Sequence, residues 1–97
     1  MAKTELQERD GKFFIKGELS FQSVPSLVDK LNFSEAELVI NLSEVSYSDS
    51  SGLALLVNWL REAKKCSVKI CFEAIPQKMM ALAKVSNLDK ILPIVSH

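Results

Sequence analysis

The chain has 97 residues, 47% apolar and 25% charged, and its twelve Lys and Arg residues balance its twelve Asp and Glu residues. These values describe one small globular domain, expected to span residues 1–97, with a single core and little room for an internal active-site cavity. Without excess positive charge, binding to nucleic acid or to anionic lipid headgroups is not expected. Function is therefore expected on the surface, toward a protein partner.

The first predicted elements are a β-hairpin and a short helix. Asp10-Gly11 is a two-residue turn signal between residues 4–8 and 12–16, both of which suit strands. Apolar residues at helical spacing then predict a short amphipathic helix over about residues 24–31.

A buried strand and a long helix follow. Residues 37–42 contain three consecutive apolar β-formers, which favours a central strand covered on both faces. A polar loop is predicted over residues 43–49. The long helix begins at Ser50-Ser51-Gly52 and ends near Lys65, a basic residue suited to the helix C-terminal dipole.

The last third of the chain predicts a strand over residues 68–75, a helix over residues 77–85 and a short edge segment within residues 88–95. Pro76 suits the start of that helix, and Asn87 suits the stop after it. Strand and helix alternate after the hairpin, which predicts an α/β fold with parallel pairing and right-handed crossovers.

Residues for catalysis or metal binding are scarce. Cys66 and Cys71 form no C-x-x-C pattern and the single histidine is His97, so we expect two reduced thiols, Cys71 packed as a small apolar residue, and no metal site. With no histidine base and no Gly-rich loop, we expect no catalytic residue, cofactor or small-molecule substrate. The longest apolar run, residues 53–57, is far below the ~20 needed to span a bilayer, which predicts a cytoplasmic protein.

The segment Ser48–Leu53 is the strongest candidate for a functional site. Asp49, Ser50 and Ser51 offer more capping groups than one helix start requires, although a cap alone contributes about 1 kcal/mol. Gly52 costs up to ~1 kcal/mol relative to alanine in a first turn and indicates close approach by another segment or molecule. A hydroxyl-bearing helix N-terminus is a docking point that would stabilise a phosphate on either serine, while Asp49 would repel it.

The long helix has an apolar arc about 200° wide, roughly twice what a one-sided core helix needs. Leu55 and Trp59 supply the excess width. They either fill space under the third helix or form an exposed apolar flank beside Ser50, where a tryptophan would be a typical anchor for a protein partner.

These segments resemble the STAS domain over nearly the whole chain. The resemblance rests on the hairpin, Gly17-Glu18-Leu19, residues 38–45, the Asp-Ser-Ser-Gly-Leu signature at 49–53, the long helix and a last helix near Leu82-Ala83-Lys84. It implies a small mixed β-sheet packed against helices, no catalytic activity, and regulation through the loop and helix that begin at the signature.

Two branches of this family are similar to the chain. In anti-sigma factor antagonists, the serine directly before the glycine, here Ser51, is phosphorylated by an anti-sigma factor kinase. The signature of the MlaB-like subunits of the phospholipid ABC transporter resembles residues 52–56, 63–65, 82–84, 87–88 and 91–93 of this chain. That branch often has threonine then glycine where Ser50 and Ser51 stand, and the Ser50 hydroxyl can replace that of threonine.

The longer match favours a non-catalytic cytoplasmic subunit that binds and supports the ATPase of a phospholipid (Mla-type) ABC transporter involved in outer-membrane lipid asymmetry, held at the inner face of the inner membrane by that complex. The alternative is an anti-sigma factor antagonist regulated by serine phosphorylation. A third possibility is a structural STAS module in another signalling assembly. The expected partner-binding residues are Asp49, Ser50, Ser51, Gly52, Leu55 and Trp59, with Ser51 as the candidate phosphorylation site.

Overall fold

The computed structural model describes residues 4–95. The strands are β1 (Glu5–Arg9), β2 (Lys12–Leu19), β3 (Glu37–Ser48), β4 (Lys69–Glu73) and β5 (Ile94–Val95). The helices are α1 (Val24–Leu27), α2 (Ser50–Lys65) and α3 (Gln77–Val85), followed by the 3₁₀ turn η1 (Leu88–Lys90).

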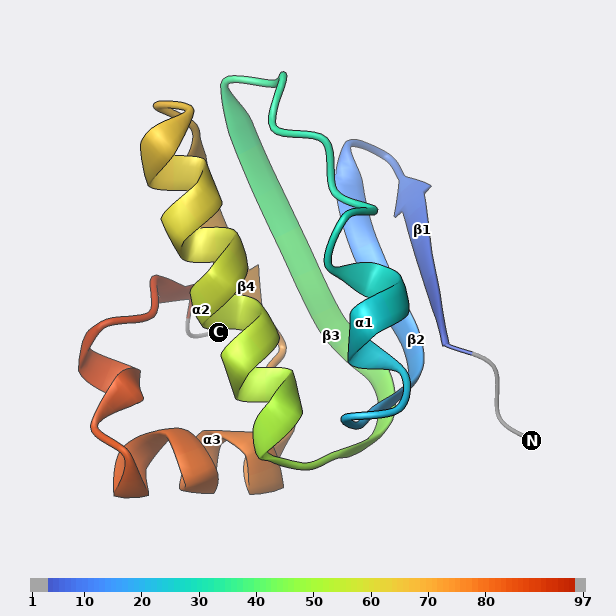
Figure 1. Cartoon of the computed structure of the whole chain (residues 1–97), viewed down its shortest axis with the longest axis vertical. Coiled ribbons are helices and arrows are strands. Elements are labelled where there is room, and N and C mark those ends of the chain that lie inside the picture. Colours follow the sequence, from blue (N-terminus) through green and yellow to red (C-terminus); the bar gives the residue numbers. More distant parts are fainter. Residues whose placement is uncertain (1–3, 96–97) are drawn as a thin grey trace.

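The strands form one mixed sheet in the order β1-β2-β3-β4-β5. β1 runs antiparallel to β2, and every other neighbouring pair is parallel. Helices α1 and α2 lie over one face of the sheet, while α3 crosses the end at which the parallel strands finish (Figure 1). This arrangement confirms the α/β fold, the mixed sheet, the opening hairpin and the central position of β3.

The hairpin forms where the turn signal predicts it. Asp10 and Gly11 both have positive φ, 51° and 79°, the conformation that a type I′ turn demands of its two central residues. Arg9 pairs with Lys12 across this turn. The right-handed twist of such a turn matches that of the strands, so a local signal alone determines the register.

Strand β3 differs from the sequence-based prediction in two ways. It runs to Ser48, so the polar loop predicted for residues 43–49 is wrong: the carboxyl half of β2 pairs with it as far as Leu19↔Ser48. Its side chains alternate, with Leu38, Ile40 and Leu42 buried in the core and the residues between them half-exposed. β3 is therefore covered on one face only, because both α1 and α2 lie on the same side of the sheet.

The helix-free face of the sheet holds a buried carboxylate. Glu73 is only 6% exposed, and its Oε1 accepts hydrogen bonds from Lys12 Nζ and Asn41 Nδ2, each at 2.9 Å. Asn41 also accepts, through Oδ1, from the backbone N–H of Ser43 at 2.8 Å. The Asn41 amide therefore joins β4 to the segment of β3 where the pairing with β2 shifts register.

We expect Asn41→Asp to destabilise the fold by roughly 2–3 kcal/mol, because it replaces the amide donor to Glu73 with a second carboxylate. Asn41→Asp combined with Glu73→Gln restores a donor and acceptor pair and should recover most of the loss. Urea unfolding followed by circular dichroism measures both variants. Equal stability of the single and double variants would contradict this role for Asn41.

Helix α1 is shorter than the predicted 24–31. It ends at Leu27 after one turn, has no side-chain cap at Ser23 and continues as irregular turns. Leu27 and Leu31 are nevertheless buried, at 2% and 5% exposure. The apolar spacing thus correctly marks the core-facing residues, but a single turn has too few hydrogen bonds to propagate as a helix.

Candidate functional site

The site lies where the carboxyl ends of β2 and β3 meet. Leu19 pairs with Ser48, and the Asp49 backbone N–H donates to the Leu19 carbonyl at 3.1 Å. The loop before α1 and the start of α2 are therefore neighbours, at the lower end of the sheet in Figure 1.

Asp49 is the N-cap of α2. Its backbone is extended, with φ −105° and ψ −168°, and its Oδ1 accepts from the Ser51 backbone N–H at 2.8 Å. One carboxylate thus caps the helix, and the bond uses the N–H of Ser51 rather than its hydroxyl. Ser50 is exposed and Ser51 half-exposed. The two hydroxyls are therefore not needed for this cap.

Gly52 is needed for packing inside the chain. A Cβ at this position would overlap Ser48 Oγ and lie 3.2 Å from both Leu19 Cβ and Met79 Cε. The close approach predicted from the sequence comes from β2, β3 and α3 of the same molecule. Gly52 is buried, so its assignment as a partner-contacting residue is wrong, and its role is to seat α2 on the sheet.

Leu55 and Trp59 are also core residues, which corrects their assignment to the partner surface. They are 1% and 0% exposed, and Trp59 Nε1 donates to the Val28 carbonyl at 3.2 Å. α2 contacts α1, α3 and the sheet strand β4, so it is covered on more than one side. The apolar arc of α2 is wide because the helix buries side chains against α1, α3 and β4.

Two exposed aromatic residues beside the site were not singled out from the sequence. Phe21 is 71% exposed in the loop that follows Leu19, and Tyr47 is 55% exposed near the end of β3. Ala54, one turn beyond Ser50, is exposed as well. An aromatic residue within a polar turn is the available sequence signal for Phe21, which the pairing of β2 with β3 brings near the start of α2. Tyr47 lines a pocket together with Met79, whose Cε lies against Gly52 in the first turn of α2.

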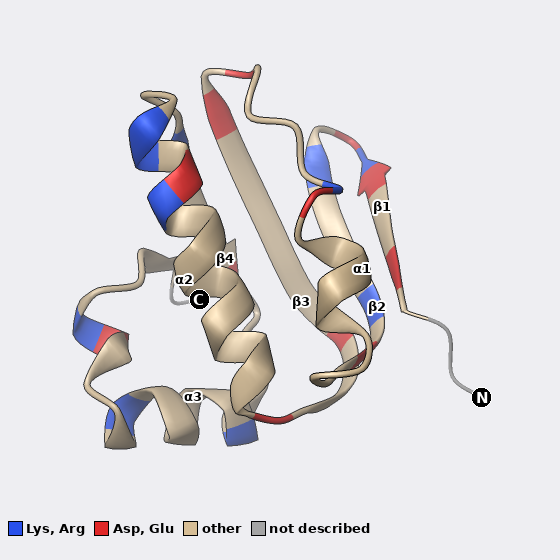
Figure 2. Ribbon diagram, in the orientation of Figure 1, with Lys and Arg blue, Asp and Glu red and all other residues tan. Residues whose placement is uncertain are grey.

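The exposed side chains at the start of α2 are small and uncharged. No residue from Ser50 to Leu60 carries a charge, so the nearest acidic side chain along the chain is that of Asp49 (Figure 2). We call Phe21, Tyr47, Ser50, Ser51 and Ala54 the α2 docking surface. Its two exposed aromatic residues are of the kind that is enriched at protein interfaces.

Both cysteines have free thiols, as expected. Burial raises the pKa of the Cys71 thiol, and the nearby carboxylates of Glu73 and Glu37 raise it further, so this thiol stays protonated at neutral pH. Within residues 4–95, no group of three or more His, Cys, Asp or Glu side chains is arranged to hold a metal ion. No helix in this range is long and apolar enough to cross a membrane.

A family model described as "Mlab, STAS domain" matches residues 3–95. The chain belongs to the STAS domain family, which confirms the resemblance found in the sequence.

Two characterised relatives are anti-sigma-B factor antagonists. That of Bacillus subtilis is 33% identical over 90 residues, covering 90% of this chain and 83% of the relative. That of Listeria monocytogenes is 26% identical over 97 residues, covering 93% of this chain and 85% of the relative.

Solved structures show the same fold. The anti-sigma factor antagonist SpoIIAA in its unphosphorylated form has a TM-score of 0.71 at 18% identity, over 97% of this chain and 89% of that one. An anti-sigma factor antagonist from Mycobacterium paratuberculosis has a TM-score of 0.69 at 23% identity, over 100% of this chain and 87% of that one.

Proposed function

We propose that the chain is a non-catalytic anti-sigma factor antagonist whose binding to an anti-sigma factor kinase is switched off by phosphorylation of Ser51. The named relatives support an antagonist over the transporter subunit that the sequence motifs favour. Both relatives are anti-sigma-B factor antagonists, and the match covers most of each relative's length. The proposed setting is the cytoplasm. The observation that carries the proposal is a half-exposed serine in the first turn of α2 whose hydroxyl is not needed for the Asp49 cap.

Phosphorylation at this point has a clear physical consequence. The Ser51 oxygen would attack the γ-phosphorus of ATP held by the partner kinase, ADP would leave, and the serine proton would pass to a base on the kinase. The helix N-terminus tolerates the new charge, whereas Asp49 repels it. A dianion on the otherwise uncharged α2 docking surface would lose its hydration on binding, so the bound partner must dissociate.

We expect Ser51→Asp to abolish binding to the cognate anti-sigma factor kinase and Ser51→Ala to preserve it, because only the first introduces charge at the interface. Calorimetry with the purified kinase measures binding, and mass spectrometry after incubation with kinase and ATP locates the phosphate. Ser51→Ala should block incorporation, and Ser50→Ala should retain it.

The cap geometry provides the control for this experiment. Asp49 uses the backbone N–H of residue 51, which both variants keep, so both should remain folded by circular dichroism. Phosphate on Ser50 alone, or unchanged binding by folded Ser51→Asp, would overturn the proposed switch.

The second candidate is the transporter subunit, supported by the Mlab description of the matching family model and by the likeness of residues 52–56 and 63–65. In that case Ser50 acts by shape and hydrogen bonding against an ABC ATPase. Ser50→Asp would then release the ATPase in a pull-down while the variant stays folded, and Ser51→Ala would have little effect. Retention of the ATPase by folded Ser50→Asp would exclude this role for Ser50.

A further inference from the structure

Strand β1 leaves one edge of the sheet open. It pairs with β2 on one side and is the terminal strand of the sheet formed by the described residues. A two-residue hairpin turn is closed by a hydrogen-bonded pair, here Arg9 and Lys12, and such pairs recur at every second residue. The backbone N–H and C=O groups of Leu6 and Glu8 therefore point outward, ready to pair with another strand.

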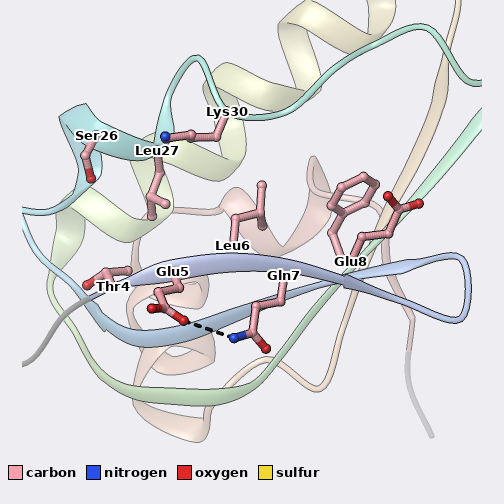
Figure 3. Close-up of a pocket in the computed structure, with 9 residues that line it drawn as sticks. Thr4, Glu5, Leu6, Gln7, Glu8, Ser26, Leu27 and Lys30 are labelled. Atoms are coloured by element: carbon pink, nitrogen blue, oxygen red, sulfur yellow. Dashed lines mark hydrogen bonds between the residues drawn. The ribbon is translucent and has the colours of Figure 1, made fainter.

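A groove runs between this edge strand and α1 (Figure 3). It has a volume of about 440 Å³ and lies on the helix-covered side of the sheet, where Leu6 and Phe13 are only half-buried. Leu6 and Glu8 project into it from β1, and Lys30 lies on its opposite wall (Figure 3).

The sequence of β1, Glu-Leu-Gln-Glu-Arg, is complementary to itself when read antiparallel. With Gln7 opposite the Gln7 of a second copy, Glu5 faces the other copy's Arg9 at both ends of the ladder. Leu6 then pairs with Glu8 through their outward backbone groups, which gives two hydrogen-bonded pairs of residues. The register centred on Glu8 would instead place like charges directly opposite each other, which is destabilising.

The side chains in this register are available for such contacts. Glu5, Gln7 and Arg9 lie on the helix-free face, where Gln7 Nε2 donates to one Glu5 oxygen, Oε2, at 3.0 Å. Arg9 pairs with Glu44 and lies over the Phe14 ring at 4.1 Å, yet its side chain is 46% exposed. A guanidinium has five N–H donors, enough for a second carboxylate.

We infer that β1 is a self-association edge, on which a second copy of this chain adds its own β1 antiparallel and continues the sheet across a two-fold axis. On the groove side, each Glu8 lies close to the other copy's groove, whose wall opposite β1 includes Lys30 from the turn that follows α1. An edge of five residues buries less than the ~800 Å² per partner of a standard stable interface, so the dimer is weak and concentration-dependent. This inference does not depend on the proposed function, because β1 is not part of the α2 docking surface.

The test uses two charge reversals and their mixture. Glu5→Arg alone places Arg opposite Arg9, and Arg9→Glu alone places Glu opposite Glu5, so each variant repels its own copy. An equimolar mixture of the two restores both opposite-charge pairs in the heterodimer. Sedimentation equilibrium from about 10 μM to about 1 mM at low salt should show wild-type dimers, a Kd raised about tenfold or more in each variant alone, and association recovered in the mixture.

The control is Glu37→Arg, the same charge change on the same face of the sheet but at the far end of β3, which should dimerise like the wild type. Circular dichroism checks that all variants fold, which matters for Arg9→Glu because it also removes the Glu44 pair. A wild type that stays monomeric throughout, or a mixture no more associated than its components, would overturn the inference. Kinase binding measured on Glu5→Arg separates this result from the proposed function, since that variant should bind normally.

Discussion

Replacing Trp59 with alanine is expected to lower the free energy of unfolding by about 3–5 kcal/mol, as is typical for loss of a fully buried aromatic side chain. Its indole is 0% exposed, and its Nε1–H donates to the Val28 carbonyl, which follows α1. The variant therefore loses core packing and leaves a backbone carbonyl without its partner. For a domain with ~5–15 kcal/mol of stability, this loss leaves a substantially unfolded population at the lower end.

Trp59→Phe is the matched control for this prediction. It keeps an aromatic ring in the core but removes the hydrogen bond, so it should cost less, about 1–3 kcal/mol. Because Trp59 is the only tryptophan in the sequence, far-ultraviolet circular dichroism during urea unfolding must replace fluorescence for both variants. A Trp59→Ala variant that keeps full stability but loses partner binding would contradict the core role of Trp59 and indicate that it contacts the partner.

Elements with local signals were predictable from the sequence. The Asp10-Gly11 turn requires positive φ at both residues, and it formed at that position. Helices α2 and α3 have Asp49 and Pro76 as their N-cap residues, and Asn87 adopts the left-handed conformation, φ 58°, after α3. In each case, two or three adjacent residues determine the backbone.

The carboxyl half of β3 was not predictable in the same way. Residues 43–48 are mostly polar, with only Val45 and Tyr47 as apolar or aromatic residues, which is typical of a loop as much as of a strand. Their strand conformation depends on pairing with the carboxyl half of β2, more than twenty residues earlier in the sequence, and on the Asn41 side chain that accepts from Ser43. Such partners are known only once the fold is assembled.

The candidate site was predicted only in part, because some of its residues also depend on partners that the assembled fold supplies. Asp49 and the two serines follow from capping chemistry, and the structure confirms the cap. The apolar periodicity of α2 reports that Leu55 and Trp59 lie on one side, but it cannot say whether other elements cover that side. The contacts of α2 with both α1 and α3 decide that question in favour of the core.

Gly52 is the residue in which the fold and the candidate site depend on each other most directly. Alanine in a helix is ordinarily favoured over glycine by roughly 0.5–1 kcal/mol. Here the added Cβ would overlap Ser48 Oγ, and it would press on Leu19 and Met79 at 3.2 Å. Overpacking of this kind costs typically ~1–3 kcal/mol, which exceeds the gain in helix propensity.

Gly52→Ala is therefore expected to destabilise the domain by about 1–2 kcal/mol net, the overpacking cost less the propensity gain. Ser48→Ala removes the overlapping oxygen at the cost of one hydrogen bond, from Ser48 Oγ to the Asp49 carbonyl at 3.0 Å. The double variant Ser48→Ala/Gly52→Ala should thus be more stable than Gly52→Ala alone, although Ser48→Ala by itself is slightly destabilising. Urea unfolding of the three variants and the wild type gives the coupling energy, expected at about 1 kcal/mol for side chains in contact. Additive effects, or a Gly52→Ala variant more stable than the wild type, would show that α2 has room to move away from β3, and that Gly52 is not what seats the helix carrying Ser51.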